Sequence, residues 1–267
     1  MQTLVNGSPV YYEVAGRGLP VVFIHAFPLD SRMWQPQIAA IADEYQTLVL
    51  DLPGFGRSPL PSDTPTMASY GDTLLAVLDA AGIAEPAFVV GLSMGGYILF
   101  EFFRGYPERV RGLVLADTRA GEDTPEGREG RLRTADQVLA QGHGPLLETL
   151  LPKLLAPGAA AGIQEQVRAM ILAASREGIA AAQRAMAARP DSRPTLAEIG
   201  VPTLIIVGDQ DQLTPPSESE ALAEAIAGSE LEVIEGAGHL SNLERPELFN
   251  AALLRFLDDL DRPGPGS

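Results

Sequence analysis

The chain has 267 residues, with 19 Lys and Arg against 35 Asp and Glu, three His and no Cys. A chain of this length forms one large domain or two small ones and buries about 70% of its unfolded surface, so it needs no disulfide to fold. The formal charge of −16 argues against nucleic-acid binding, because phosphate affinity requires clustered Lys and Arg. The absence of Cys excludes disulfides, thiolate metal sites and cysteine nucleophiles.

The composition is typical of a folded globular protein, with 46% hydrophobic and 20% charged residues. The first residues lack the basic patch and apolar run of a signal peptide. The sequence contains no stretch of 18 apolar residues, so no membrane-spanning helix is predicted. We therefore expect a cytoplasmic protein with no membrane partner. Residues 261–267 are rich in Pro and Gly and are predicted to form a disordered tail.

Short apolar runs alternate with helical patterns along most of the chain. The runs that predict strands are rich in Val, Ile and Leu and lie at 21–24, 47–50, 87–90, 112–115, 203–207 and 231–234. Helical patterns follow at 34–41, 66–81, 94–106, 217–227 and 245–257. Continuous apolar strands separated by helices indicate a parallel sheet covered on both faces. The start differs, because residues 4–5 and 10–14, joined through Asn6-Gly7, predict a β-hairpin.

Residues 118–194 contain no strand pattern. They are rich in Ala, Leu, Gln and Arg and are interrupted by Gly and Pro, which predicts three or four short helices. A helical insertion between two strands of one sheet is usually a cap over the ligand end of that sheet. We therefore predict a discontinuous α/β core, residues 1–117 and 195–260, and a helical cap, residues 118–194.

The strongest chemical signal is the segment Gly91-Leu92-Ser93-Met94-Gly95-Gly96, which lies between a predicted strand and a predicted helix. In this context G-x-S-x-G forms a sharp turn that exposes the Ser93 hydroxyl and requires small neighbours. The N-terminus of the following helix directs free N–H groups at the place where an oxyanion would form. The same string occurs in ordinary Gly-rich loops, but the flanking elements favour a nucleophile.

A serine nucleophile requires a base, and the chain has three His. His239 lies between the last predicted strand and the last helix, at the sheet edge where open α/β sheets carry their sites. His25 ends an early strand, where we expect a structural or oxyanion-loop role. His143 lies between two glycines in the predicted cap and is expected to be a solvated turn residue. His239 is therefore the predicted base.

The base in turn requires a carboxylate that fixes its tautomer. Asp209 and Asp211 both follow the strand that resumes the sheet, and either can cap the turn there. One is predicted to be the catalytic acid and the other a structural residue. Serine, then aspartate, then His239 is the chain order of α/β-hydrolases.

Five pieces of the chain together resemble the α/β-hydrolase superfamily, over about residues 1–260. They are residues 25–30 (HAFPLD), 51–58 (DLPGFGRS), the Ser93 turn, 208–211 (GDQD), and Gly238-His239 followed by residues 244–246 (ERP). Within the superfamily the sequence is similar to small capped serine esterases, 3-oxoadipate enol-lactonase-like hydrolases, C–C hydrolases and cofactor-free haloperoxidases. The resemblance implies an α/β fold with a mostly parallel eight-stranded sheet, flanking helices and a helical cap after the sixth strand.

The resemblance also assigns individual residues. It places the catalytic acid at Asp211 and leaves Asp209 as the turn residue. It implies an oxyanion hole formed by the backbone N–H groups of Phe27 and Met94. One departure concerns the residue after His25, where the family usually has Gly and this chain has Ala26; Ala can shift the loop, but we still expect a working oxyanion hole.

The function implied is hydrolysis of a carboxylic ester or lactone through an acyl-enzyme on Ser93, without cofactor or metal. A C–C bond hydrolase or a perhydrolase would use the same residues, and a non-catalytic ligand receptor on this fold is a further alternative. A dehalogenase or epoxide hydrolase would need a carboxylate at the position of Ser93. The expected partner is a small ester or lactone, and the sequence does not predict the oligomeric state.

The main alternative is an enol-lactonase, whose carboxylated substrate requires a cation near Ser93. Arg119 is the first candidate, with Arg131 and Arg133 in the predicted cap, although a solvated face is the more common reason for an Arg at each of these positions. The leucines of the predicted cap either line an acyl pocket or pack the cap's own core. The residues predicted to bind substrate are Trp34, Arg119, Leu132, Leu139 and Leu147.

Overall fold

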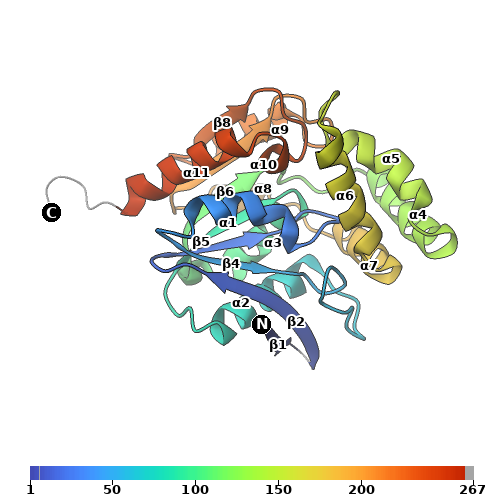
Figure 1. Cartoon of the computed structure of the whole chain (residues 1–267), viewed down its shortest axis with the longest axis horizontal. Coiled ribbons are helices and arrows are strands. Elements are labelled where there is room, and N and C mark those ends of the chain that lie inside the picture. Colours follow the sequence, from blue (N-terminus) through green and yellow to red (C-terminus); the bar gives the residue numbers. More distant parts are fainter. Residues whose placement is uncertain (6, 262–267) are drawn as a thin grey trace, which may run out of the picture.

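A computed structural model describes residues 1–5 and 7–261. An eight-stranded sheet crosses its centre in the order β1-β2-β4-β3-β5-β6-β7-β8 (Figure 1). The strands are β1 Gln2–Val5, β2 Ser8–Ala15, β3 Pro20–Ile24, β4 Gln46–Leu50, β5 Ala87–Leu92, β6 Val110–Ala116, β7 Thr203–Gly208 and β8 Glu230–Ile234. The predicted eight-stranded α/β-hydrolase architecture is confirmed.

The sheet has an antiparallel edge and a parallel remainder. β1 pairs with β2, and β2 with β4, in antiparallel orientation, whereas β4, β3, β5, β6, β7 and β8 are parallel. Val5 pairs with Ser8, as the predicted hairpin requires, and Asn6 lies outside the described residues. Every residue of β3, β5 and β7 is buried, which explains their uninterrupted apolar sequences.

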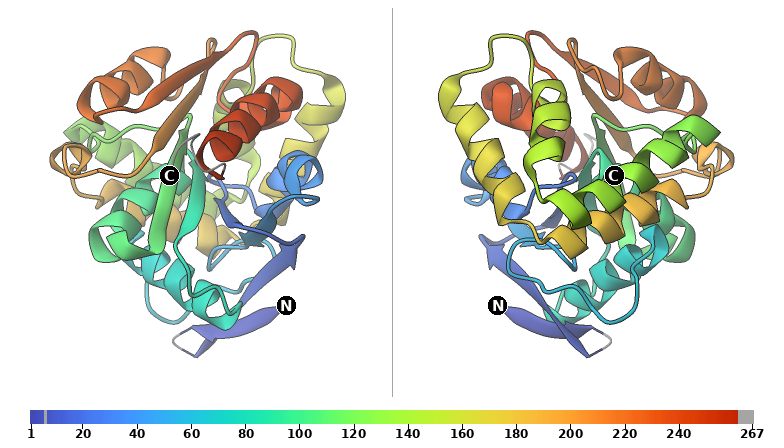
Figure 2. Two further views of the ribbon diagram at one scale, coloured as in Figure 1. Left: turned by 90° about the vertical axis from the view of Figure 1, so that its left-hand side faces the viewer. Right: turned by 90° about the vertical axis from the view of Figure 1, so that its right-hand side faces the viewer.

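Helices cover both faces of this sheet (Figure 2). On one side α1 packs against α11, and on the other α2 packs against α3. The helices outside residues 118–192 are α1 Gln35–Ile41, α2 Met67–Ala80, α3 Met94–Gly105, α8 Arg193–Leu196, α9 Pro216–Ala225, α10 Ser241–Glu244 and α11 Pro246–Asp261. Because α11 extends to Asp261, the predicted tail begins one residue too early, and residues 262–267 lie outside the described residues.

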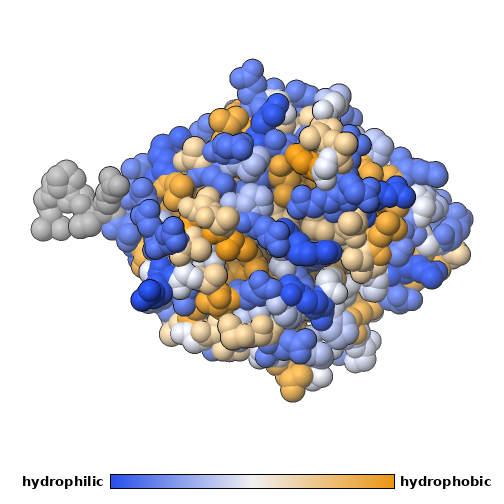
Figure 3. All heavy atoms as spheres, viewed as in Figure 1, coloured by the Kyte–Doolittle hydropathy of each residue, from blue (hydrophilic) through white to orange (hydrophobic). Residues whose placement is uncertain are grey.

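Four helices lie between the end of β6 and α8, in a stretch that is described throughout and contains no strand. They are α4 Pro125–Gln141, α5 Gly144–Leu154, α6 Ala161–Ala173 and α7 Arg176–Ala187. We call residues 118–194 the inserted segment. Its helices gather at one end of the molecule, where hydrophilic residues cover much of the surface (Figures 1 and 3). Because α8 begins at Arg193, it crosses the predicted boundary at residue 194, and the division into domains stays a prediction.

Between residues 1 and 5 and between 7 and 261, no helix is both long and apolar enough to cross a bilayer. The cytoplasmic location stays a prediction from the sequence.

Candidate active site

Ser93 occupies a strained turn between β5 and α3, with φ of 56° and ψ of −112°. A non-glycine residue in this region costs about 1–3 kcal/mol and persists only where its surroundings hold it. Here the Ser93 N–H donates to the carbonyl of Ala116 at 2.9 Å, and the Thr118 hydroxyl donates to the Ser93 carbonyl at 2.8 Å. The end of β6 therefore fixes the turn, and Ser93 remains half-buried beside a cavity.

Two glycines of the turn are required by close backbone contacts. A Cβ atom on Gly91 would lie 2.6 Å from the carbonyl carbon of Gly95. A Cβ atom on Gly95 would lie 2.5 Å from the carbonyl oxygen of Ile24. Both distances are too short for any side chain, so the small residues predicted around Ser93 are a steric requirement of the turn.

His239 and Asp211 form a buried pair. Asp211 Oδ2 lies 2.8 Å from His239 Nδ1, and it also accepts a hydrogen bond from the Thr214 hydroxyl at 2.7 Å. Asp211 Oδ1 accepts the N–H groups of Leu213 at 2.8 Å and Thr214 at 3.0 Å. Because an ionised carboxylate only accepts, the proton lies on His239 Nδ1, which leaves Nε2 free to take a proton.

The environment keeps Asp211 ionised. Burial alone would raise the pKa of the Asp211 carboxyl, but the charge of His239 and the hydrogen bonds from His239 and Thr214 outweigh it, so the pKa lies below its usual value. Asp209, two residues earlier, instead accepts the N–H groups of Gly236 at 2.8 Å and Ala237 at 3.3 Å. Asp209 thus has the contacts of a turn residue, and Asp211 those of a partner for His239.

A third aspartate, Asp117, lies behind this pair and had no signal in the sequence. It is fully buried at the end of β6, with φ of 43°. Its carboxyl group accepts the Gly208 N–H at 2.9 Å and the Ser241 hydroxyl at 2.5 Å. Burial and the negative charge of Asp211 raise the pKa of Asp117 well above its usual value. Asp117 therefore links β6 to the segments that carry Asp211 and His239.

The two predicted oxyanion donors are free to bind a ligand. Within the described residues, neither the Phe27 N–H nor the Met94 N–H donates to a protein acceptor, and Phe27 lines the cavity beside Ser93. The φ of Ala26 is not positive, since Ser93 and Asp117 are the only non-glycine residues with positive φ in the described chain. The change from Gly to Ala at residue 26 therefore introduces no backbone strain.

The other two histidines have structural contacts. His25 Nε2 accepts the Leu52 N–H at 3.0 Å, and Nδ1 lies 3.0 Å from the Ala26 carbonyl oxygen, which assigns the proton to Nδ1. Burial lowers the pKa of His25, so the ring stays neutral. His143 is partly buried, with Nε2 2.8 Å from the Ala174 carbonyl oxygen. Neither ring lines the cavity beside Ser93.

Ser93 and His239 line a single cavity of about 190 Å³, which we call the Ser93 cavity. The core contributes the residues around the serine and the histidine, and the inserted helices contribute the opposite wall. The other lining residues are Phe27, Tyr97, Arg119, Arg131, Leu150, Leu154, Gln183, Met186, Leu213 and Thr214.

Of the residues predicted to bind substrate, only Arg119 lines this cavity. Trp34 was predicted wrongly: it is fully buried in the core, 5.1 Å from the Phe23 ring and 6.1 Å from the Phe249 ring between centroids. Leu132 and Leu139 were also predicted wrongly, because they project from α4 into solvent and are 44% and 39% exposed.

Leu147 is a further correction. It is buried among the inserted helices, whereas Leu150 and Leu154 of the same helix reach the cavity. Sequence spacing identifies the apolar face of α5 but not which of its leucines faces a neighbouring helix and which faces the cavity.

A charged cluster borders the Ser93 cavity, which it lines through Arg119 and Arg131. Asp123 accepts hydrogen bonds from Arg189 at 2.7 and 2.9 Å, from Arg131 at 2.5 Å and from Arg119 at 2.6 Å. Burial would raise the pKa of the Asp123 carboxyl, but its hydrogen bonds with Arg189 and Arg131 hold the pKa far below its usual value. Three guanidinium groups face this carboxylate, and the charge of Glu218 also acts on Arg119, so the cluster keeps a surplus of positive charge. Arg189 also lies over the Tyr97 ring, 4.3 Å from its centroid.

Several lining residues were not predicted from the sequence. Tyr97 lies one helical turn after Ser93, and Thr214 lies three residues after Asp211, so a search around those two residues would have found them. Gln183 and Met186 lie on α7, where no local pattern distinguishes them. In the part of the chain that the structure describes, no three His, Asp or Glu side chains are grouped to hold a metal ion.

The strained serine, the buried His–Asp pair and the eight-stranded sheet together define a hydrolase fold with its site at the carboxyl ends of the strands. A family model described as the alpha/beta hydrolase fold matches residues 20–246. The chain belongs to the α/β-hydrolase family.

Similar proteins include esterases and lactonases. A thermophilic esterase from Thermogutta terrifontis, solved with malate bound, superposes with a TM-score of 0.94 at 40% identity, covering 98% of this chain and 97% of that one. An enol-lactonase from Burkholderia xenovorans superposes with a TM-score of 0.88 at 28% identity, covering 97% and 100%. The 3-oxoadipate enol-lactonase 2 of Acinetobacter baylyi is 33% identical over 236 residues, 87% of this chain and 86% of the relative.

Proposed function

We propose that the protein is a serine hydrolase that cleaves a carboxylic ester or lactone through an acyl-enzyme on Ser93. One observation carries the proposal: Ser93, held in a strained turn, shares a small cavity with His239, whose Nδ1 is bonded to the buried Asp211. The esterases and enol-lactonases among the similar proteins support the same class of reaction.

In the first step His239 Nε2 accepts the proton of the Ser93 hydroxyl as the oxygen attacks the substrate carbonyl. The negative charge that develops on the carbonyl oxygen is stabilised by the N–H groups of Phe27 and Met94, each contributing about 3 kcal/mol in the transition state. Collapse of this intermediate breaks the ester bond, and the leaving alkoxide takes the proton from His239.

In the second step water replaces the alcohol. His239 takes a proton from the water molecule, which attacks the acyl carbonyl, and the same two N–H groups stabilise the second oxyanion. The bond to the Ser93 oxygen then breaks, the proton returns to that oxygen, and the carboxylic acid leaves. Asp211 stays ionised throughout and stabilises the positive charge of His239.

The proposal includes a role for the inserted segment as a cap over the site. Five residues of its helices line the Ser93 cavity, opposite the residues of the core; they are Arg131, Leu150, Leu154, Gln183 and Met186. A cavity of about 190 Å³ corresponds to roughly six water molecules at about 30 Å³ each, which favours small acyl groups.

A second candidate, a hydrolase of carboxylated lactones, is favoured by the cations in this cavity. Arg119 and Arg131 both line it, and they share the Asp123 carboxylate with Arg189, while Glu218 acts on Arg119 as well. A substrate carboxylate would compensate the remaining charge. Malate, bound to the Thermogutta esterase, is a dicarboxylate, and the Acinetobacter relative is named for an oxoadipate lactone.

Initial rates over p-nitrophenyl esters of rising chain length, beside simple and carboxylated lactones, test both candidates. We expect turnover of short esters, and turnover restricted to carboxylated lactones would favour the second candidate. Ser93→Ala is expected to abolish hydrolysis without unfolding the chain, and retained turnover would contradict the proposal. A p-nitrophenol burst without turnover would favour a receptor, and preferential acyl transfer to hydrogen peroxide would favour a perhydrolase.

A further inference from the structure

The charges of this protein are divided unequally between its two parts. The inserted segment contains ten basic and nine acidic residues, a net charge of +1, whereas the rest of the chain contains nine basic and 26 acidic residues, a net charge of −17. The negative net charge of the whole chain therefore comes from the core, whereas the inserted segment is close to neutral.

Four of the ten basic residues of the inserted segment line an outer cavity of about 570 Å³. This outer cavity adjoins the Ser93 cavity, because five residues line both; they are Arg119, Arg131, Leu150, Gln183 and Leu213. Four basic side chains line the outer cavity, against one acidic side chain, Asp123; the basic residues are Arg119, Arg131, Arg133 and Lys153.

The two basic residues farther from Ser93 are only weakly neutralised. Arg133 pairs with Glu129 at 2.6 Å, but both side chains are largely exposed, so water screens the pair. Lys153, the only lysine in the sequence, has no ion-pair partner among residues 1–5 and 7–261. Its ammonium group is therefore free to attract an anion in the outer cavity.

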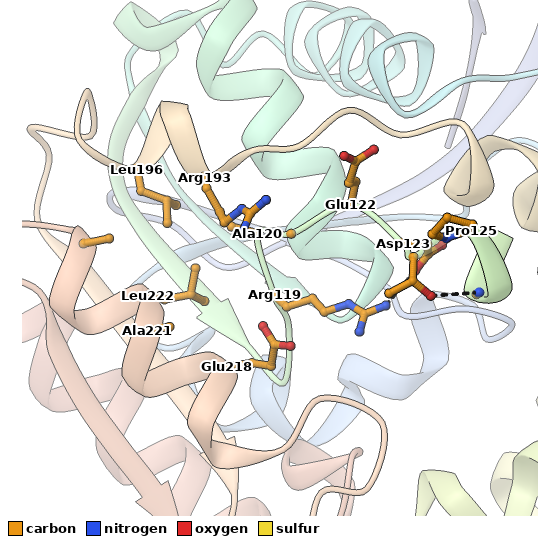
Figure 4. A pocket seen from close by; sticks show the side chains of 14 residues that line it. Arg119, Ala120, Glu122, Asp123, Pro125, Arg193, Leu196, Glu218, Ala221 and Leu222 are labelled. Carbon is orange, nitrogen blue, oxygen red and sulfur yellow. Dashed lines mark hydrogen bonds and ion pairs between the residues drawn. The ribbon is translucent and has the colours of Figure 1, made fainter.

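The larger cavity on the other side of Arg119, about 720 Å³, has a different balance of charge. Arg119 and Arg193 face three acidic residues there, Glu122, Asp123 and Glu218. Figure 4 shows Glu218 beside the Arg119 side chain, whose guanidinium extends toward Asp123. An anion would meet as much repulsion as attraction in this cavity, which leaves the outer cavity as the electropositive approach to Ser93.

A cleft lined by one sign of charge focuses the electrostatic field and raises the local concentration of an oppositely charged ligand by about 10- to 1,000-fold. The acidic core does not cancel this effect, since exposed charges are screened beyond about 8–10 Å at ordinary ionic strength. The charges that an approaching substrate senses are then those of the outer cavity.

We propose that the outer cavity is an electropositive vestibule through which carboxylate-bearing substrates reach Ser93. Arg133 and Lys153 attract the anion, and Arg119 and Arg131 receive it at the inner end. This inference rests on the proposed hydrolase function and deepens it by giving the substrate class and its route. Because the outer residues act before the chemical step, they influence kcat/KM and leave kcat almost unchanged.

The test compares two substrates with one leaving group: mono-p-nitrophenyl glutarate, which carries a carboxylate, and p-nitrophenyl pentanoate, which is neutral. The test variant is the double substitution Arg133→Glu and Lys153→Glu. The matched control is Arg168→Glu with Arg176→Glu, which makes the same change of charge at exposed positions of the inserted segment outside the lining of the Ser93 and outer cavities.

At about 0.1 M ionic strength we expect kcat/KM of the test variant to fall about tenfold or more for the glutarate ester and to change less than about twofold for the pentanoate ester. The control variant should change less than about twofold for both. Raising the salt to 0.5 M should lower kcat/KM of the wild type for the glutarate ester relative to the pentanoate ester. The difference in kcat/KM for the glutarate ester between wild type and test variant should become smaller.

An equal fall for both esters, or no fall for the glutarate ester, would overturn the vestibule while leaving the hydrolase intact. Failure of the proposed function has a different signature, because wild type would then hydrolyse neither ester, or Ser93→Ala would hydrolyse both. Circular dichroism and thermal unfolding of the test variant distinguish loss of charge from loss of fold.

Discussion

The core and the inserted segment hold their polar groups in different ways. In the core, the buried groups around the candidate site are matched: His239 binds Asp211, and His25 accepts the Leu52 N–H. In the inserted segment the cluster around Asp123 is left with surplus positive charge. A matched network fixes geometry, whereas an unmatched one leaves a binding preference to be satisfied by a ligand. We infer that the core performs the chemistry and that the inserted segment selects the substrate.

The largest expected effect tests the core. Asp211→Asn removes the charge that supports His239 and disturbs its tautomer, so kcat should fall about 10⁴-fold with the fold retained. Asp209→Asn is the matched control, because Asp209 binds only backbone N–H groups in the turn. Steady-state kinetics with a p-nitrophenyl ester provide the comparison. Equal losses in the two variants would contradict the assignment of Asp211 as the catalytic acid.

The next prediction tests the stability of the inserted segment. Asp123→Asn leaves Arg119, Arg131 and Arg189 without their common carboxylate, and breaking a buried ion pair in this way costs about 3–5 kcal/mol. For a protein of this size we expect Tm to fall by about 10 °C. Differential scanning calorimetry measures it.

Asp136→Asn supplies the control for that experiment, because Asp136 pairs with Arg184 on the surface, where both side chains are exposed. Surface pairs contribute little, so its Tm should stay within about 2 °C of wild type. A control as unstable as Asp123→Asn would show that the buried cluster has no special role.

Removing one arginine from the Ser93 cavity is expected to have a smaller effect, on the selectivity for carboxylated over neutral esters. Arg131→Met removes one cation from the Ser93 cavity while keeping an unbranched side chain, so kcat/KM for a carboxylated ester should fall about 10- to 100-fold. A neutral ester of equal length should be affected less than about threefold. The ratio of the two constants is measured on the same preparation. An unchanged ratio would assign Arg131 to the support of Asp123 alone.

The smallest expected effect is the pH dependence of folding stability that arises from Asp123. The pKa of Asp123 is depressed in the folded protein, so the unfolded chain binds its proton more readily as pH falls. Its stabilising contribution is complete above the ordinary Asp pKa of about 3.9 and decreases as pH falls below it. Urea unfolding at pH 5 and pH 3 should therefore show the stability gap between wild type and Asp123→Asn becoming smaller. A gap that widens at pH 3 would contradict the prediction.

The fold and the residues of the core were predictable because their signals are local. Uninterrupted apolar runs identified β3, β5 and β7, and the turn around Ser93 is specified by Gly91 and Gly95, whose Cβ atoms would collide with the backbone. Asp209 and Asp211 were both found from their position after β7, but that position left open which one pairs with His239, and the family resemblance chose Asp211. Each of these features depends on a few adjacent residues.

The wall of the Ser93 cavity was poorly predicted because it depends on how distant helices meet. Leu132 and Leu139 were expected to face the site, but α4 turns that side to solvent. Trp34 packs with rings from β3 and α11, which a single sequence cannot bring together. The cluster at Asp123 unites three arginines separated by as many as 70 residues.

The central claim is that Ser93 carries the acyl group during hydrolysis. Rapid acid quench during turnover of p-nitrophenyl butyrate, followed by peptide mass spectrometry, measures this directly. The account predicts a butyryl adduct on the peptide that contains Ser93, formed together with the p-nitrophenol burst and missing in Ser93→Ala. Turnover without an adduct on that peptide, or with the adduct on another residue, would contradict it.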